Sequence, residues 1–172
     1  PEEILGFVVP IFEELIDEGC QVIVVACNTV STTLITELRE KFTVPLIAIE
    51  PMVKPASEIT KSNVIAVCAT PTTLASDRYA WLKKTYAEGV RVIEPDTSNW
   101  SKMIEDDKTN HDKIKEQIDE VLSESADVIV LACTHYHWIE KDIVQLAADR
   151  ARVLQPEQPI IEQLKRVLAQ LA

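Results

Sequence analysis

Two cysteines of this chain each follow a short apolar run of the kind that forms a buried strand. Cys27 comes directly after the run 22–26, and Cys133 comes directly after the run 128–132. A free thiol has a pKa of about 8.5, so modest stabilisation makes it a usable base near neutral pH. Two thiols on opposite sides of one carbon atom can remove a proton from one side and deliver a proton to the other. The pair therefore suggests a racemase that uses two cysteine bases and no cofactor.

Short polar side chains accompany both thiols. Asn28 and Thr29 follow the first cysteine, and Thr134 and His135 follow the second. The amide and hydroxyl groups could hold a substrate carboxylate or ammonium group, although helix capping accounts for the same residue types. His135 could tune the nearby thiol or donate a proton. All four are therefore candidate site residues.

A third polar loop and one acidic residue complete the set of candidates. Thr70, Thr72 and Thr73 follow the apolar run 64–68, and helix capping is again the alternative explanation. Glu105 opens an acidic run after several apolar residues, so it could point inward at a helix end. Ligands of parallel α/β sheets bind beyond the carboxyl ends of the strands, where the threonines and both cysteines fall.

A metal site is an alternative use of some of these residues. Cys133, His135 and His137 could act as ligands, with Cys27 as a fourth. The spacing Cys-x-His-x-His matches no common structural zinc motif, and a strand end explains Cys133 without a metal. We therefore predict no metal. The sequence has only three glycines and no phosphate-cradling glycine motif, which argues against a nucleotide cofactor.

Composition limits the remaining classes of function. The chain has 172 residues, of which 47% are hydrophobic, so a core can form without disulfides. A net charge of −11 argues against a general nucleic-acid binder. Four cysteines are too few for a disulfide scaffold and indicate a reducing cytoplasm. Of the other two, Cys20 is expected in a turn and Cys68 in the core. No apolar run approaches the ~20 residues of a membrane span.

Strand and helix patterns alternate along the chain. Continuous apolar runs predict strands at 22–26, 46–49, 64–68, 90–93 and 128–132, with helical patterns between and after them. Such runs suit parallel strands covered on both faces, so we predict an α/β fold of two similar lobes with mainly parallel sheets flanked by helices. Pro10 interrupts the first helical pattern and predicts a kink or two short helices.

The predicted lobes are interleaved in the sequence. Residues 57–63 are a plausible crossing from one lobe to the other. We assign residues 1–58 and 150–172 to the first lobe, which is expected to be incomplete and to lack an N-terminal strand, and residues 59–149 to the second.

Four segments together resemble glutamate racemases of the Asp/Glu racemase superfamily. The segment 25–31 is similar to the first cysteine motif of that family, and 131–136 is similar to the second. The segments 49–56 and 70–79 also fit the family pattern, and the four matches occur in family order. The histidine and tyrosine at 135 and 136 favour the glutamate branch over aspartate or hydantoin racemases.

The resemblance implies a cofactor-independent racemase acting on L- and D-glutamate. Cys27 would take the α-proton from D-glutamate and Cys133 would take it from L-glutamate. His135 would assist Cys133, and Glu105 aligns with an acidic residue that assists catalysis. The substrate would be held by Asn28, Thr29, Thr70, Thr73 and Thr134. The resemblance further implies a cytoplasmic homodimer that supplies D-glutamate for peptidoglycan synthesis, with no nucleic-acid or membrane partner.

The sequence departs from the family pattern at several places. The family's Asp-Ser-Gly and Pro-Tyr-Gly loops do not occur, so we expect a further N-terminal segment. Ala132 stands where glycine is usual, and residues 137–138 replace a usual Pro-Leu. Residues 154–157 lack a usual Asp-Ser pair. These departures leave two alternatives open, namely another amino-acid or hydantoin racemase and a catalytically inactive binding protein with the same fold.

Overall fold

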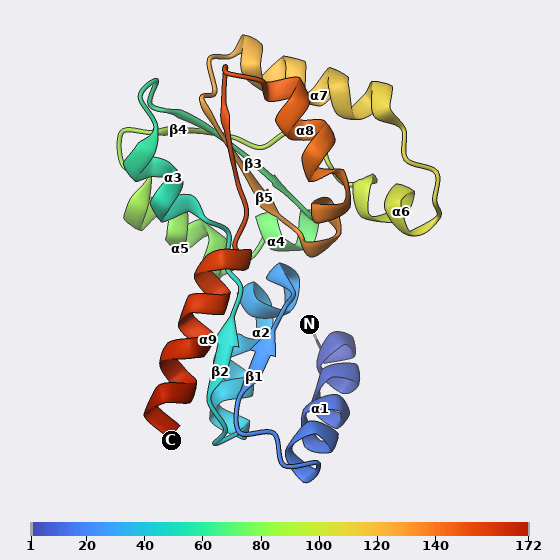
Figure 1. Ribbon diagram of the computed structural model, residues 1–172, viewed down its shortest axis with the longest axis vertical. Coiled ribbons are helices and arrows are strands. Elements are labelled where there is room, and N and C mark those ends of the chain that lie inside the picture. Colours follow the sequence, from blue (N-terminus) through green and yellow to red (C-terminus); the bar gives the residue numbers. More distant parts are fainter. Residues whose placement is uncertain (1, 172) are drawn as a thin grey trace. The chain divides into compact units, whose positions relative to one another are not determined.

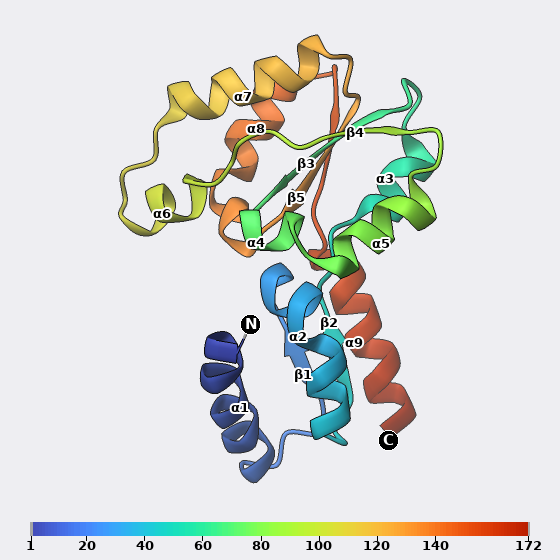
Figure 2. The same ribbon diagram turned by 180° about the vertical axis from the view of Figure 1, so that it is seen from behind.

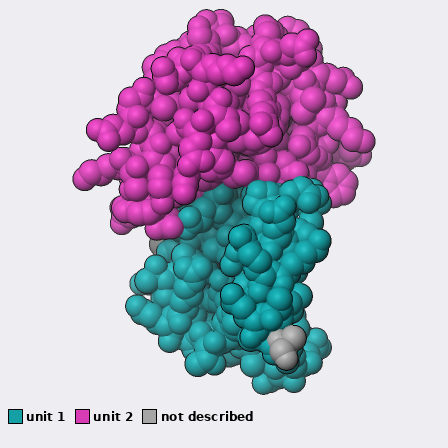
Figure 3. Space-filling view, turned by 60° about the vertical axis from the view of Figure 1, so that its left-hand side comes forward, with its two compact units in different colours: residues 1–50, 156–172 teal, residues 51–155 magenta. Residues whose placement is uncertain are grey.

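The computed structural model describes residues 2–171 and divides the chain into two compact units (Figure 3). Unit 1 comprises residues 1–50 and 156–172, and unit 2 comprises residues 51–155. The segment 57–63, predicted as the crossing between lobes, lies inside unit 2. The physical reason is helix α3 (Val53–Ile59), whose Val53 and Ala56 are fully buried in the core of unit 2.

Unit 2 is built on one parallel sheet. Its strands, in sheet order, are β4 (Arg91–Ile93), β3 (Val64–Ala69), β5 (Val128–Ala132) and β6 (Arg152–Leu154). The central pair aligns Ala69 with Ala132, so both strands end at the same level of the sheet. Strand β6 was not predicted, because Val153 is its one β-branched residue and Arg152 is charged, so the segment does not stand out as a strand pattern.

Helices cover both faces of this sheet (Figures 1 and 2). One face carries α3 and α5 (Asp77–Tyr86), and the other carries α7 (His111–Ser123) and α8 (Glu140–Ala147), with α6 (Trp100–Glu105) beside them. Side chains alternate along each strand, so Cys68 and Cys133 contribute to the core on the α6–α8 side, whereas Val67 and Ala132 contribute to the other. The sheet geometry therefore turns Cys133 toward the side on which α6 lies.

Unit 1 has a smaller parallel sheet and three helices. It consists of α1 (Glu2–Asp17), β1 (Ile23–Val25), α2 (Asn28–Lys41), β2 (Leu46–Ala48) and α9 (Glu157–Leu171). Its core centres on Phe12, Leu34 and Leu38, which pack with residues of both strands. The prediction of an α/β fold with parallel sheets flanked by helices is confirmed in both units.

Helix α1 continues through Pro10, so of the two predicted alternatives, a kink or two short helices, the second was wrong. A proline inside a helix leaves the carbonyl group four residues earlier without its helical partner. Here that residue is Gly6, and both Gly6 and Pro10 are exposed, so water can hydrogen-bond the freed carbonyl. Leu5, Val8 and Phe12 pack along the opposite, inward side and hold the helix together.

Within residues 2–171, no helix combines the length and apolarity that a membrane crossing requires.

The turn that enters β3 is organised by a carboxylate from a distant part of the chain. Asp127 accepts hydrogen bonds from the Thr60 hydroxyl, from Lys61 N at 2.6 Å and from Ser62 N at 2.9 Å. Partial burial raises the pKa of Asp127, but these hydrogen bonds outweigh burial and hold the pKa below its usual value. The ionised carboxylate therefore fastens the start of β5 to the start of β3.

We expect Asp127→Asn to lower the free energy of unfolding by about 1 kcal/mol at neutral pH, because the amide accepts these hydrogen bonds less strongly. The folded-state pKa of Asp127 is lowered. The extra free energy of unfolding that Asp127 provides over asparagine is therefore fully present above the unfolded-state pKa of about 3.9, and it is lost as pH falls through the folded-state pKa. Urea unfolding followed by circular dichroism between neutral pH and about pH 3 would measure it. Asp149→Asn, at an exposed position beyond α8, is the control. A difference between parent and Asp127→Asn that does not change with pH would contradict this account.

Candidate active site

The first cysteine lies between a strand and a helix of unit 1. Cys27 follows β1 in an extended conformation, with φ −145° and ψ 117°, and is the N-cap residue of α2. Its carbonyl group accepts a hydrogen bond from Ser31 N at 2.9 Å. The thiol makes no capping hydrogen bond and is half-buried, so it remains available for chemistry.

Ser31 fixes the position of this loop. Its hydroxyl donates to Val25 O at 3.2 Å and accepts from Ile49 N at 3.1 Å, and its side chain is fully buried. One side chain thus ties the first turn of α2 to the carboxyl ends of both strands of unit 1. Because Cys27 lies between Val25 and Ser31, this tie restricts where its thiol can lie.

The polar neighbours of Cys27 differ in their environment. Asn28 is only 2% exposed, and its side-chain amide has no hydrogen-bond partner among the described residues of the protein. Such a buried, unsatisfied amide costs free energy unless another group pairs with it. Thr29 is half-buried, and its carbonyl group accepts a hydrogen bond from the Thr33 hydroxyl at 2.7 Å. Asn28 therefore has a donor and an acceptor to offer to a bound molecule.

The second cysteine has the same backbone setting in unit 2. Cys133 follows β5 with φ −150° and ψ 132° and is the N-cap residue of the 3₁₀ helix η1 (Thr134–Ile139). Its carbonyl group accepts from Tyr136 N at 3.0 Å. Unlike Cys27, it is buried, with 7% of its surface exposed. Thr134 follows it as the first, half-buried residue of η1.

Cys133 is the first member of a chain of three titratable side chains. Its Sγ atom lies 3.7 Å from His135 Nδ1, and His135 Nε2 lies 2.6 Å from Glu105 Oε1. An ionised carboxylate only accepts hydrogen bonds, so Nε2 must carry a proton. A neutral His135 then presents the lone pair of Nδ1 to the thiol. The arrangement lets His135 accept the thiol proton while Glu105 stabilises the imidazolium that forms.

A second polar group reaches the same sulfur atom from α6. Ser101 Oγ lies 3.5 Å from Cys133 Sγ. Ser101 was not among the predicted site residues, although the sequence carried a signal for it. It precedes Glu105 by four residues, and residues four apart share one face of a helix.

The threonine loop lies beside Cys133 in the sheet. The alignment of Ala69 with Ala132 makes Thr70 and Cys133 the first residues beyond two neighbouring strands. Thr70 is the N-cap residue of the short helix α4 (Pro71–Leu74), and its Oγ1 accepts from Thr73 N at 3.3 Å and lies 3.1 Å from Thr73 Oγ1. The predicted capping role is thus present, and Thr73 is fully buried.

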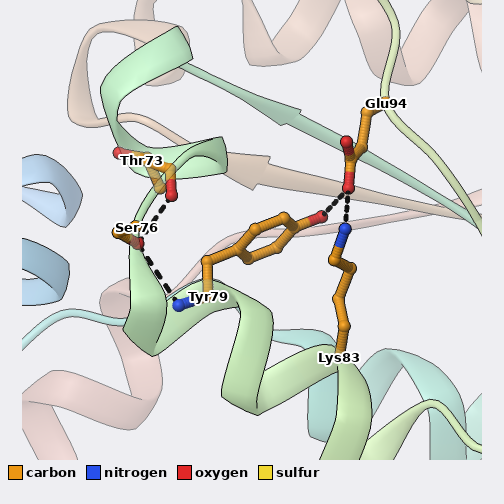
Figure 4. Close-up of polar contacts among 5 residues, drawn as sticks. All are labelled: Thr73, Ser76, Tyr79, Lys83 and Glu94. Carbon is orange, nitrogen blue, oxygen red and sulfur yellow. Dashed lines mark hydrogen bonds and ion pairs between the residues drawn. The ribbon is translucent and has the colours of Figure 1, made fainter.

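A series of polar contacts connects this loop to α5 and to the end of β4 (Figure 4). The Ser76 hydroxyl donates to Thr73 O at 2.7 Å and accepts from Tyr79 N at 3.2 Å. The phenol of Tyr79 donates to Glu94 Oε1 at 3.0 Å, and Lys83 Nζ lies 2.6 Å from the same oxygen. Burial and the adjacent Glu94 carboxylate raise the pKa of Tyr79, so its phenol stays protonated. The loop is therefore anchored on a rigid, capped helix.

A buried network of hydrogen bonds that no sequence pattern predicted lies close to Cys133. The Thr97 hydroxyl donates to Ala69 O at 2.9 Å, and the phenol of Tyr136 donates to Thr97 O at 3.0 Å. Thr97 and Tyr136 are both buried, and Trp100 packs edge-on against the Tyr136 ring. This network fastens η1, and with it His135, to the end of β3.

The remaining predictions can be placed as follows. Cys68 is fully buried, and burial raises the pKa of its thiol to about 12, which rules it out as a base near neutral pH. Cys20 is exposed. Within the part of the chain that the structure describes, no three histidine, cysteine or acidic side chains are grouped as metal ligands. Trp138, in the pair that departs from the family pattern, is 83% exposed.

The two units thus define a class of α/β protein in which each parallel sheet ends in a helix-capping cysteine with polar neighbours. Residues 5–164 match the model of the family described as Asp/Glu/Hydantoin racemase. This chain belongs to that family, and the resemblance inferred from its cysteine motifs is confirmed.

Curated relatives place the chain near one branch of the family. It is 34% identical over 173 residues to a glutamate racemase of Ralstonia pickettii, covering 98% of this chain and 61% of the relative. It is 33% identical to a glutamate racemase of Herpetosiphon aurantiacus, covering 98% of this chain and 68% of the relative. The chain thus spans 61% of the length of the Ralstonia pickettii relative.

Solved structures show the same fold. The glutamate racemase of Escherichia coli, in complex with L-glutamate and the activator UDP-MurNAc-ala, has a TM-score of 0.81 at 23% identity, covering 98% of this chain and 64% of that chain. The glutamate racemase of Francisella tularensis, in complex with D-glutamate, has a TM-score of 0.75 at 24% identity, with the same coverage.

Proposed function

We propose that this chain carries the catalytic cysteines of a cofactor-independent glutamate racemase. The observation that supports this most strongly is the matched setting of Cys27 and Cys133. Each follows a parallel strand, caps a helix in the same extended conformation and precedes a polar residue. Membership of the racemase family and the names of the curated relatives favour glutamate as the substrate.

In the proposed reaction, each cysteine serves one face of the substrate. The Cys133 thiolate removes the α-proton of L-glutamate, and the electron pair of the broken C–H bond remains on the α-carbon, stabilised by the adjacent carboxylate. The Cys27 thiol then delivers its proton to the opposite face, which yields D-glutamate. The reverse reaction starts from the Cys27 thiolate. Each turnover leaves the two cysteines with exchanged protonation states.

His135 and Glu105 prepare Cys133 for this role. The thiol proton passes to His135 Nδ1, and the Glu105 carboxylate accepts the hydrogen bond from Nε2. A thiolate next to an imidazolium is a common form of activated cysteine. Asn28, Thr29, Thr70, Thr73 and Thr134 are proposed to hold the substrate, with the orphaned amide of Asn28 as the strongest candidate.

The wider role follows from the product. D-Glutamate made in the cytoplasm would supply peptidoglycan synthesis, and the active protein is proposed to be a homodimer. The proposed division into lobes at 58/59 and 149/150 lies eight and six residues from the boundaries of the two compact units, which fall at 50/51 and 155/156.

Circular dichroism tests the proposed activity directly. L- and D-glutamate are incubated separately with the 172-residue chain and with any longer gene product that contains it, without added cofactor. Decay of both signals to zero would support a racemase. If L-glutamate and D-glutamate both stay optically pure while aspartate or a hydantoin racemises, the chain would be assigned to another branch of the family.

An inactive binding protein is the second candidate, and the exposed Trp138 in the departing pair 137–138 is the observation that favours it. Isothermal titration calorimetry with L-glutamate discriminates between the two candidates. Saturable binding without racemisation or α-hydrogen exchange would support the binding protein.

A further inference from the structure

We propose that Ser101 is a positioning residue that donates a hydrogen bond to the Cys133 thiolate and lowers the pKa of that thiol. The inference extends the proposed function, because it assigns a role to a residue that is not among the predicted site residues and that the comparisons do not mention. It concerns unit 2 alone and can be tested without substrate.

Two groups, one from His135 and one from Ser101, approach the sulfur atom of Cys133 and have different roles. His135 Nδ1 and Ser101 Oγ both lie within reach of Cys133 Sγ, at 3.7 Å and 3.5 Å. The Glu105 carboxylate keeps the proton of neutral His135 on Nε2, so Nδ1 is an acceptor when the thiol is protonated. The hydroxyl of Ser101 is then a neutral group that can donate to the sulfur atom of either the thiol or the thiolate, and the charge of the thiolate strengthens that hydrogen bond.

Tyr136 competes with Cys133 for the proton of the Ser101 hydroxyl. The phenol of Tyr136 also interacts with Ser101, but the phenol proton is directed to Thr97 O at 3.0 Å. Tyr136 is therefore an acceptor toward Ser101, as Cys133 is. When Cys133 is a thiolate, its negative charge makes it the stronger of the two acceptors. Burial and the nearby Cys133 raise the pKa of Tyr136, so the phenol remains neutral and does not add a second charge.

Helix α6 carries Ser101 and fixes its position. Ser101 and Glu105 lie four residues apart on α6, and they contact Cys133 and His135 respectively. Trp100, the first residue of α6, is almost fully buried and packs on Tyr136, which fixes the start of the helix. One short helix thus contacts both Cys133 and His135. Because the start of this helix is packed in the core, the Ser101 hydroxyl has a fixed position.

The test is the pH dependence of alkylation of Cys133 by iodoacetamide, measured by mass spectrometry of the peptide that contains it. A thiolate reacts and a thiol does not, so the midpoint of the rate profile gives the pKa. We expect Ser101→Ala to raise the pKa of Cys133 by about one unit. At pH values below the midpoint, the rate of Cys133 alkylation should then fall about tenfold. Ser101→Thr keeps the hydroxyl and is expected to restore a profile close to that of the parent. Alanine is well tolerated in a helix, so Ser101→Ala is expected to fold.

Two controls make the result specific. Cys27, measured in the same molecules, is expected to keep its parent midpoint. Ser123→Ala makes the same chemical change at an exposed position of α7, where the hydroxyl contacts only its own helix, and is expected to leave Cys133 unchanged. An unshifted Cys133 midpoint in Ser101→Ala, or an equal shift in Ser123→Ala, would overturn the proposal. A specific shift in a chain that does not racemise glutamate would support the role of Ser101 and refute the proposed function instead.

Discussion

Serine in place of either Cys27 or Cys133 is expected to lower the rate of glutamate racemisation by about 10³–10⁴-fold, because each cysteine is the proton-transferring group on one face of the substrate. A serine hydroxyl is nearly isosteric with the thiol, but its far higher pKa leaves almost none of it ionised near neutral pH. Both cysteines cap a helix through their backbone, and neither uses its side chain for the cap, so serine should leave the fold intact.

The single variants are also expected to separate the two half-reactions. In Cys27→Ser the remaining Cys133 should still exchange the α-hydrogen of L-glutamate with deuterium oxide, but not that of D-glutamate. Cys133→Ser should show the opposite preference. Proton NMR of each enantiomer in deuterium oxide measures both rates.

The matched control for this pair is Cys20→Ser, which makes the same substitution at an exposed cysteine. It is expected to racemise at the parent rate. Parent-like racemisation by both Cys27→Ser and Cys133→Ser would refute the two-base mechanism. Loss of exchange with both enantiomers in each variant would instead indicate that both thiols are needed to bind the substrate.

Replacing His135 by asparagine is expected to lower kcat/KM for racemisation by about 10²-fold, the contribution typical of one acid–base group. Asparagine can still donate a hydrogen bond, but it cannot accept and hold the proton of Cys133. Glu105→Gln is expected to cost less, about tenfold, because Glu105 is largely exposed and acts on the thiol only through His135. Since enantiomers have equal free energies, kcat/KM must fall by the same factor in both directions, and steady-state rates alone cannot assign His135 to one cysteine.

Double variants make that assignment. His135→Asn combined with Cys27→Ser is expected to lose exchange of L-glutamate, which depends on Cys133. The same change combined with Cys133→Ser is expected to keep exchange of D-glutamate, which depends on Cys27. Asp106→Asn, next to Glu105 on an exposed turn, is the control for loss of negative charge and should retain parent activity. Equal loss in both double variants would show that His135 does not act through Cys133.

Much of the fold followed from local patterns in the sequence. The apolar runs predicted five strands, and each lies within about two residues of its observed bounds, because buried parallel strands need continuous apolar side chains. Strand β6 was missed, and the sequence left open whether α1 continues through Pro10. The first is fixed by pairing with β5 rather than by its own three residues, and the second by packing that outweighs the local cost of proline.

The sequence also identified the residues able to do chemistry, since their types and positions after strands are local properties. Only the tertiary structure decided which of them meet. Glu105 and Cys133 lie 28 residues apart in sequence, and a chain of contacts through His135 connects them because side chains of β5 alternate and turn Cys133 toward α6. The same packing placed Ser101 and Thr97, which belong to no motif, against Cys133 and against Tyr136 of the second cysteine motif. The sequence determined which groups could transfer a proton. The packing of α6 on the sheet decided which side chains surround Cys133, because contacts between distant segments depend on how helices and strands pack.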